Sequence, residues 1–111
     1  MAAGDVTHLG DWTLGNGMAG DLRIMFGTVV LDGGNPTPVT LTNYLKSVMF
    51  GGVSINGSGA PASDPAQITC DWSAAVLNIY AWKPTAQGDT ALVASTDNAR
   101  VVNWMAIGPH V

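Results

Sequence analysis

The sequence LRIMFGTVVL, residues 22–31, decides the fold more than any other stretch of the chain. Its apolar, β-branched and aromatic residues predict a β-strand. One of its two alternating sides holds Leu22, Ile24, Phe26 and Val30, and the other holds Met25, Val29 and Leu31. Because a strand that is apolar on both sides is typical of the interior of a sheet, we expect this strand to be central.

Shorter strand patterns follow, separated by residues that favour turns. Gly, Pro, Asn, Asp and Ser gather at residues 32–36 and 56–65, and such clusters interrupt strands. The patterns predict strands at Ser47–Ile55, Ala91–Ser95 and Arg100–Ile107, and a hairpin made of Gln67–Trp72 and Val76–Trp82. Two features add detail: Thr40–Leu45 favours a single helical turn, and Gly51 with Gly52 indicates a bulge, a bend or a close backbone approach.

Five or six short strands without a long helix are typical of all-β proteins. We therefore predict a single small β-sandwich or barrel-like domain at residues 21–111, preceded by a Gly-rich N-terminal arm at residues 1–20. The arm carries large apolar residues, which flexible linkers seldom do. Two interpretations of it stay open: an arm that reaches a neighbouring molecule, and an irregular segment folded back on the chain's own core.

The composition favours contact with other protein subunits. Hydrophobic residues make up 47% of the 111 residues and charged residues only 11%, against roughly 25% in an ordinary soluble domain. A surface so poor in charge loses little hydration when another subunit covers it. Nucleic-acid binding is not expected, because four basic residues and a net charge of −4 cannot neutralise many phosphates. We also expect neither a secretory signal nor a membrane span.

Candidates for chemistry are few. His8 and Asp11 are three residues apart, and His110 lies near the other end, but metal sites usually need three or four convergent ligands. We interpret Asp32–Asn35 as a turn, since a calcium loop supplies more oxygen ligands and usually a Glu. Cys70 is the only cysteine, and we expect it to be buried and unreactive. In the absence of a catalytic or cofactor motif, we predict no enzyme activity, no cofactor and no metal.

From residue 22 to residue 108 the order of elements resembles that of small structural proteins of tailed bacteriophage virions, the head decoration or cement proteins. The residues that carry the resemblance are the strand Arg23–Leu31, the segment Pro-Thr-Pro-Val-Thr-Leu at residues 36–41 leading to Tyr44-Leu45, the strand Val48–Val53, the hairpin with Cys70-Asp71-Trp72 and Val76–Trp82, and the closing Val101–Gly108. The Gly-rich segment before Gly20 departs from that pattern.

The resemblance implies a protein that is made in the host cytoplasm and binds the outside of an assembled phage head, where it stabilises contacts between capsomers. The expected partners are the major capsid protein and sister copies of the chain, with a trimer as the guessed oligomer and with no nucleic acid or membrane. We expect the arm, residues 56–65, or both to make the contacts with capsid subunits or sister copies. The candidate contact residues are Leu9, Trp12, Leu14, Met18, Asn56, Ser58 and Pro61.

A receptor-binding or glycan-binding module of a phage tail or fibre is the alternative. Four tryptophans in so short a chain could form a stacking platform for sugar rings, although aromatic residues also dominate cores and interfaces. Two or more Trp or Tyr side chains exposed on one face would favour this alternative.

Overall fold

The computed structural model describes residues 2–17, 20–57, 65–86, 88 and 91–111. These residues form eight β-strands and no helix. In chain order the strands are β1 (Val6–Gly17), β2 (Gly20–Val30), β3 (Thr37–Thr40), β4 (Phe50–Ile55), β5 (Gln67–Ser73), β6 (Val76–Pro84), β7 (Leu92–Ala94) and β8 (Val101–Pro109).

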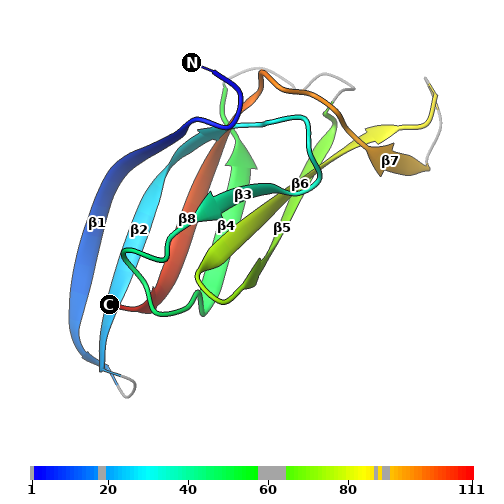
Figure 1. Ribbon diagram of the computed structural model, residues 1–111. Helices are drawn as coiled ribbons and strands as arrows, with labels where there is room; N and C mark the ends of the chain where they lie inside the picture. The colour runs from blue at the N-terminus through cyan, green and yellow to red at the C-terminus, as the bar shows by residue number, and fades with distance from the viewer. Residues whose placement is uncertain (1, 18–19, 58–64, 87, 89–90) are drawn as a thin grey trace.

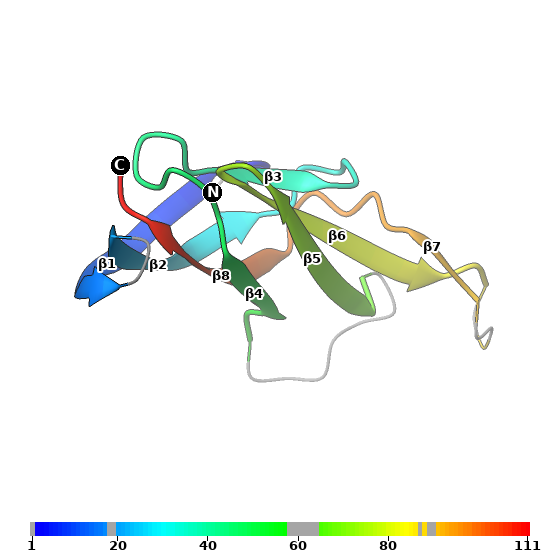
Figure 2. The same cartoon turned by 90° about the horizontal axis from the view of Figure 1, so that it is seen from below.

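Two antiparallel sheets pack against each other as a sandwich (Figure 1). Sheet A has the strand order β1-β2-β8-β4, and sheet B has the order β3-β6-β5, with β7 paired to the far end of β6. Seen from below, the ends of β1 and β2 reach past sheet B on one side, and the β6-β7 pair reaches past sheet A on the other (Figure 2). The all-β sandwich predicted from the sequence is therefore confirmed.

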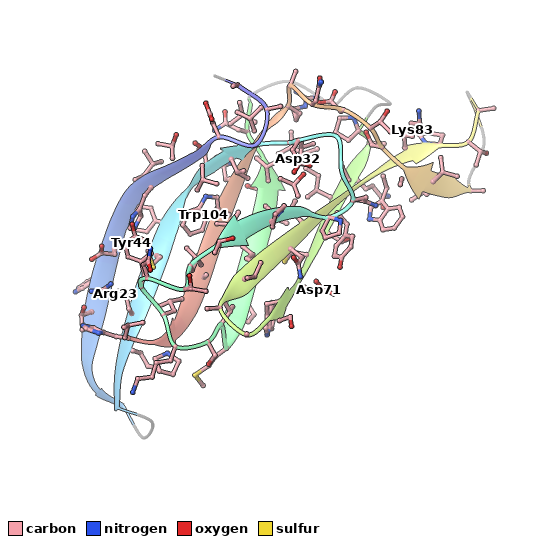
Figure 3. The ribbon with its side chains drawn as sticks, in the orientation of Figure 1. Arg23, Asp32, Tyr44, Asp71, Lys83 and Trp104 are labelled. Atoms are coloured by element: carbon pink, nitrogen blue, oxygen red, sulfur yellow. The ribbon has the colours of Figure 1, made fainter. Side chains whose placement is uncertain are left out.

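The core lies between the two sheets and is built from alternate residues of the strands. In β6 and β8 every second residue is buried, including Leu77, Ile79 and Trp104. The Trp104 side chain lies between the sheets (Figure 3), and its indole N–H donates a hydrogen bond of 3.1 Å to the Thr28 carbonyl oxygen. Because that polar group is satisfied, the large ring can be buried without an unpaired donor.

The strand and hairpin predictions agree closely with the structure. The strand predicted at residues 22–31 is β2, and it lies between β1 and β8 as expected. The predicted hairpin is β5-β6, which turns through Ala74 and Ala75, and the last two predicted strands are β7 and β8. Residues 41–45 make the expected single helical turn, closed by a hydrogen bond from the Leu45 N–H to the Leu41 carbonyl oxygen.

Of the two adjacent glycines of β4, Gly51 lies at a close approach, and neither forms a bulge. The register of β4 with β8 runs without a shift through Gly51 and Gly52. A Cβ atom on Gly51 would lie 2.6 Å from a methyl carbon of Leu77 on sheet B, so a larger residue there would force the Leu77 side chain to shift. β4 also begins at Phe50, three residues later than the strand predicted from Ser47.

The structure corrects the prediction of an N-terminal arm. Residues 6–17 form the edge strand β1, which pairs with β2 from Val6↔Val29 to Gly17↔Gly20. The structure therefore does not support an arm separate from the β-domain. The strand pattern is hidden in the sequence because a register shift between His8 and Gly10 inserts one extra residue, Leu9. Such a bulge reverses the alternation of sides half-way along the strand, so no single period of two is visible.

Candidate functional site: the outer face of sheet A

The register of sheet A determines which residues point away from sheet B. Side chains alternate along a strand, so partners of an inward residue also point inward. Met25 and Ala106 are paired and fully buried, and their neighbours Phe26, Met105 and Ile107 therefore lie on the outer face. Three rows of partners cross the outer face in this way: Trp12-Ile24-Ile107-Phe50, Gly10-Phe26-Met105-Gly52 and Thr7-Thr28-Asn103-Ser54.

Two of these rows form a continuous apolar surface, which we call the outer patch: Trp12, Ile24, Phe26, Phe50, Met105 and Ile107. Its aromatic members are strongly exposed, with 68% of Trp12, 54% of Phe50 and 44% of Phe26 open to solvent. Phe50 lies at the edge of the patch, where its ring also meets the Trp72 ring of sheet B with centroids 6.2 Å apart. Large contiguous apolar surface is uncommon on monomeric proteins and marks sites of association. The outer patch is therefore the strongest candidate for a functional surface.

The outer face also lacks charge. None of the residues in the three rows is Asp, Glu, Lys, Arg or His. The nearest charged residues on the same strands, Asp11 and Arg23, pair with inward-facing partners, Met25 and Gly108. A partner that covered this face would not have to desolvate a charged group, which removes the largest penalty of burying polar surface.

Two glycines shape the outer patch. The Phe26 ring lies over Gly10, where a Cβ atom would be only 2.7 Å from the end of the ring. Gly52, by contrast, has no atom near the position of a Cβ, and an open hollow of about 210 Å³ lies beside it, lined by Gly52, Val53, Ser54, Asn103, Trp104 and Met105. The face thus carries a protruding Trp12 at one edge strand and a hollow at the other.

A polar row borders the outer patch. The Asn56 side-chain amide donates a hydrogen bond of 2.8 Å to the Asn103 side-chain oxygen, and the Asn103 amide donates one of 3.0 Å to the Ser54 hydroxyl oxygen. These bonds hold the Asn103 side chain in place between its neighbours. The row supplies polar groups at the rim of an apolar surface, which is the usual arrangement in protein interfaces.

Only some of the predicted contact residues lie on or beside the outer patch. Trp12 belongs to the outer patch, Leu9 is exposed at the bulge of β1, and Asn56 stands in the polar row. The backbone of Leu14 pairs with Leu22. Met18, Ser58 and Pro61 lie outside the residues that the structure describes.

Sequence reasoning missed the remaining members of the outer patch, Ile24, Phe26, Phe50, Met105 and Ile107. The signal was present in β2, where both sides are apolar, but it was interpreted only as a sign of a central strand.

The residues considered for metal binding do not converge. His8 Nε2 lies 3.8 Å from a carboxylate oxygen of Asp11, while His110 Nδ1 lies 2.6 Å from the Val111 carbonyl oxygen. In the described ranges no group of three or more His, Cys, Asp or Glu residues could hold a metal ion. In the Asp32–Asn35 segment, the Asp32 carboxylate accepts hydrogen bonds from the Gly34 N–H and the Thr37 hydroxyl, so its oxygens stabilise the turn.

A half-enclosed hollow of about 280 Å³ lies between β1 and the turn at residues 41–45. The His8 ring meets the Tyr44 ring edge-on with centroids 5.1 Å apart, and Tyr44 and Trp104 both border the hollow (Figure 3). Its remaining lining residues are Val6, Thr40, Leu41 and Asn43.

Cys70 is half-buried on β5 and packs against the core cluster, where full burial was expected. Burial, with a smaller contribution from the Asp71 carboxylate, raises the pKa of the Cys70 thiol. A raised pKa keeps the thiol protonated at neutral pH, and the protonated form is not a nucleophile. This environment supports the expectation of an unreactive cysteine, which stays a prediction.

The outer face of sheet B is more polar and carries two aromatic rings. Tyr80 and Trp82 alternate with buried residues of β6, and their rings are nearly parallel, at 16°, with centroids 6.3 Å apart. The Tyr80 hydroxyl donates to the Asp71 carboxylate and the Trp82 indole N–H donates to the Thr69 hydroxyl oxygen. Burial, followed by this hydrogen bond and the charge of Asp71, raises the pKa of Tyr80. Both rings are half-buried and held by neighbours.

No protein-family model, no curated protein and no solved structure matches the chain. Within the part of the chain that the structure describes, no helix is long and apolar enough to cross a membrane.

Proposed function

We propose that the chain is a structural virion protein, a capsid decoration or cement protein that stabilises a phage head from the outside and carries out no reaction. The observation that carries the proposal is the outer patch, which is apolar, uncharged and exposed. The virion context comes from the resemblance of residues 22–108 to head decoration proteins. The contact surface comes from the geometry of sheet A.

The size of the outer patch suits attachment that depends on several copies. If an aromatic side chain offers about 150–250 Å², the exposed parts of Trp12, Phe26 and Phe50 amount to roughly 350 Å². Burying that area is worth roughly 9 kcal/mol at about 25 cal/mol per Å². Association itself costs about 4–15 kcal/mol, so one contact is weak. On a repeating shell, several weak contacts act together and become durable.

A particle-binding assay tests the proposal. Purified chain is mixed with phage heads that lack it, and bound chain and the temperature of head disruption are measured. We expect stoichiometric binding and a higher disruption temperature. Trp12→Ser should weaken binding, whereas Leu92→Ser, an equally simple change at an exposed residue of β7, should not. If the wild-type chain binds no heads, the proposal is wrong.

Glycan binding is the second candidate, and one observation favours it. Tyr80 and Trp82 lie side by side on one face with nearly parallel rings and with polar groups of Asp71 and Thr69 beside them. Flat rings next to hydrogen-bonding groups can stack on sugar rings. A glycan array tests this function: reproducible binding that Trp82→Ala abolishes would support it, and an empty array would count against it.

A further inference from the structure

We infer that the partner on the outer patch is a second copy of the same chain, bound face to face so that Trp12 of each copy lies in the hollow beside Gly52 of the other. This inference rests on the proposed role of the outer patch as a protein contact surface, and it names a sister copy as the occupant. Heads are then bound by the dimer, and Trp12→Ser weakens head binding because it removes the second copy and with it the gain from two linked contacts. It is carried by a protrusion and a hollow on one and the same face.

The two features stand on opposite edges of sheet A. Trp12 lies on β1 and Gly52 on β4, and β2 and β8 run between them. With strands about 4.8 Å apart, the two residues are separated by roughly 14 Å across the sheet. Trp12 is the most exposed member of the outer patch, and Gly52 is the position with open space around it.

A two-fold axis between the copies gives two equivalent contacts, in each of which the Trp12 protrusion of one copy meets the hollow beside Gly52 of the other. When two identical faces meet about an axis that lies in their plane, residue i of one copy meets residue j of the other, and j meets i. An axis that passes mid-way between Trp12 and Gly52 runs between β2 and β8. It places the Trp12 of each copy against the Gly52 of its partner. Ile24, Phe26, Met105 and Ile107 then form the centre of the interface.

The area of the face suits a dimer. β8 has nine residues, which gives a length of about 30 Å, and four strands span about 19 Å, so the face covers roughly 550 Å² in projection. A standard interface buries about 800 Å² of accessible surface on each partner, and side chains raise the accessible area above the projected area. Because β4 has only six residues, the outer face is of a size near the lower end of the standard range for a dimer interface.

The distribution of charge favours a copy of this chain as the partner. The chain has a net charge of −4, so two copies repel each other wherever acidic surfaces meet. The three rows of the outer face carry no charge. Two copies can thus meet on this face without placing like charges together, which would otherwise oppose association.

Sedimentation equilibrium of the purified chain, without phage heads, tests the inference over a range of concentrations. We expect a dimer. Trp12→Ser should remove the protrusion and Gly52→Leu should fill the hollow, and each should raise the dissociation constant at least tenfold. Gly52→Leu should still fold, because no atom lies near the Gly52 Cβ position, and circular dichroism checks this. Leu92→Ser is the matched control and should leave the dimer unchanged.

Three outcomes would overturn the inference: a wild-type chain that stays monomeric up to about 1 mM, a dimer that neither substitution weakens, or a trimer, which the two-fold arrangement does not allow. The result is distinguishable from that of the particle assay. A dimer that fails to bind heads contradicts the decoration role alone. A monomer that binds heads, with binding weakened by Trp12→Ser, assigns the outer patch to the capsid protein and contradicts only the dimer.

Discussion

Gly27 of β2 packs against the backbone carbonyl of Thr7 on β1 so closely that no methyl group fits between them. Gly27→Ala should therefore push the two strands apart. We expect the free energy of unfolding to fall by about 3 kcal/mol or more, at the upper end for overpacking, because a backbone carbonyl cannot rotate away as a side chain can. Urea denaturation followed by circular dichroism measures the change. Gly52→Ala is the control, since its Cβ would meet no atom, and it should change stability by less than about 0.5 kcal/mol.

The β5-β6 turn contains a strained residue. Ala74 has a φ of 51°, in the left-handed region that residues other than Gly and Asn seldom adopt. Ala74→Asn should raise the free energy of unfolding by about 0.5–1 kcal/mol, because Asn tolerates this backbone conformation. Ala74→Val should lower it, since a β-branched side chain fits the conformation poorly. Thermal melts of the three proteins should give the order Asn, Ala, Val, and an equal melting temperature for all three would show that the turn stores no strain.

Removal of residues 1–17 should strongly destabilise the chain. Because β1 pairs along most of the length of β2, its loss would leave β2 as an unpaired edge and remove the backbone that packs against Gly27. We expect a domain that is unfolded or retains less than half of its stability, out of about 5–15 kcal/mol for a typical domain. Far-ultraviolet circular dichroism with a melt measures this. A truncated chain that melts like the full chain would show that β1 is dispensable.

Cys70 should react slowly with alkylating reagents at neutral pH. Burial and the Asp71 carboxylate raise its pKa, so little thiolate is present. The rate of reaction with iodoacetamide should rise only at a pH above the ordinary pKa of a thiol. Asp71→Asn should increase the rate at a fixed pH, because it removes the charge that disfavours the thiolate. Urea-unfolded chain provides the reference, because its Cys70 has the ordinary pKa. Equal rates for folded and unfolded chain would contradict the prediction.

The same shift has a consequence for stability. The folded chain favours the neutral thiol, so the contribution of Cys70 to stability is fully present below the ordinary thiol pKa. It is lost as the pH rises from that value through the raised pKa of the folded state. Cys70→Ser should therefore show a weaker fall in stability at alkaline pH than the wild-type chain, as measured by urea denaturation at several pH values.

Local patterns in the sequence were enough to predict most strands. The alternation in β6 and β8 is regular, and it predicted both strands. That Leu77, Ile79 and Trp104 stand on the buried side is known only from the structure. β1 was missed because the bulge at Leu9 shifts its alternation. β3 was missed because its four residues contain a proline and follow a turn cluster. Short or shifted strands are recognisable only through their pairing partners.

The candidate site was less predictable than the fold. Trp12 was identified as a contact residue, but its neighbours Phe26 and Phe50 were not, although they lie on the same surface. The outer patch joins β1, β2, β8 and β4, whose residues are far apart in the sequence, so no window of the chain contains it. An apolar residue also gives no sign in sequence of whether it faces the core or the solvent. Only the arrangement of the strands in the two sheets shows which side of β2 faces the core and which faces the solvent.

β8, one of the two inner strands of sheet A, is synthesised after the seven other strands of the described residues. β8 separates β2 from β4, and it pairs Val102 with Val29 across more than half of the chain. While residues 101–109 remain inside the ribosome, β2 and β4 therefore have no partner between them. The β5-β6 hairpin, which is local, can form earlier. Sheet A closes only after translation has passed β8, so the apolar strands β2 and β4 lack their shared partner until that point.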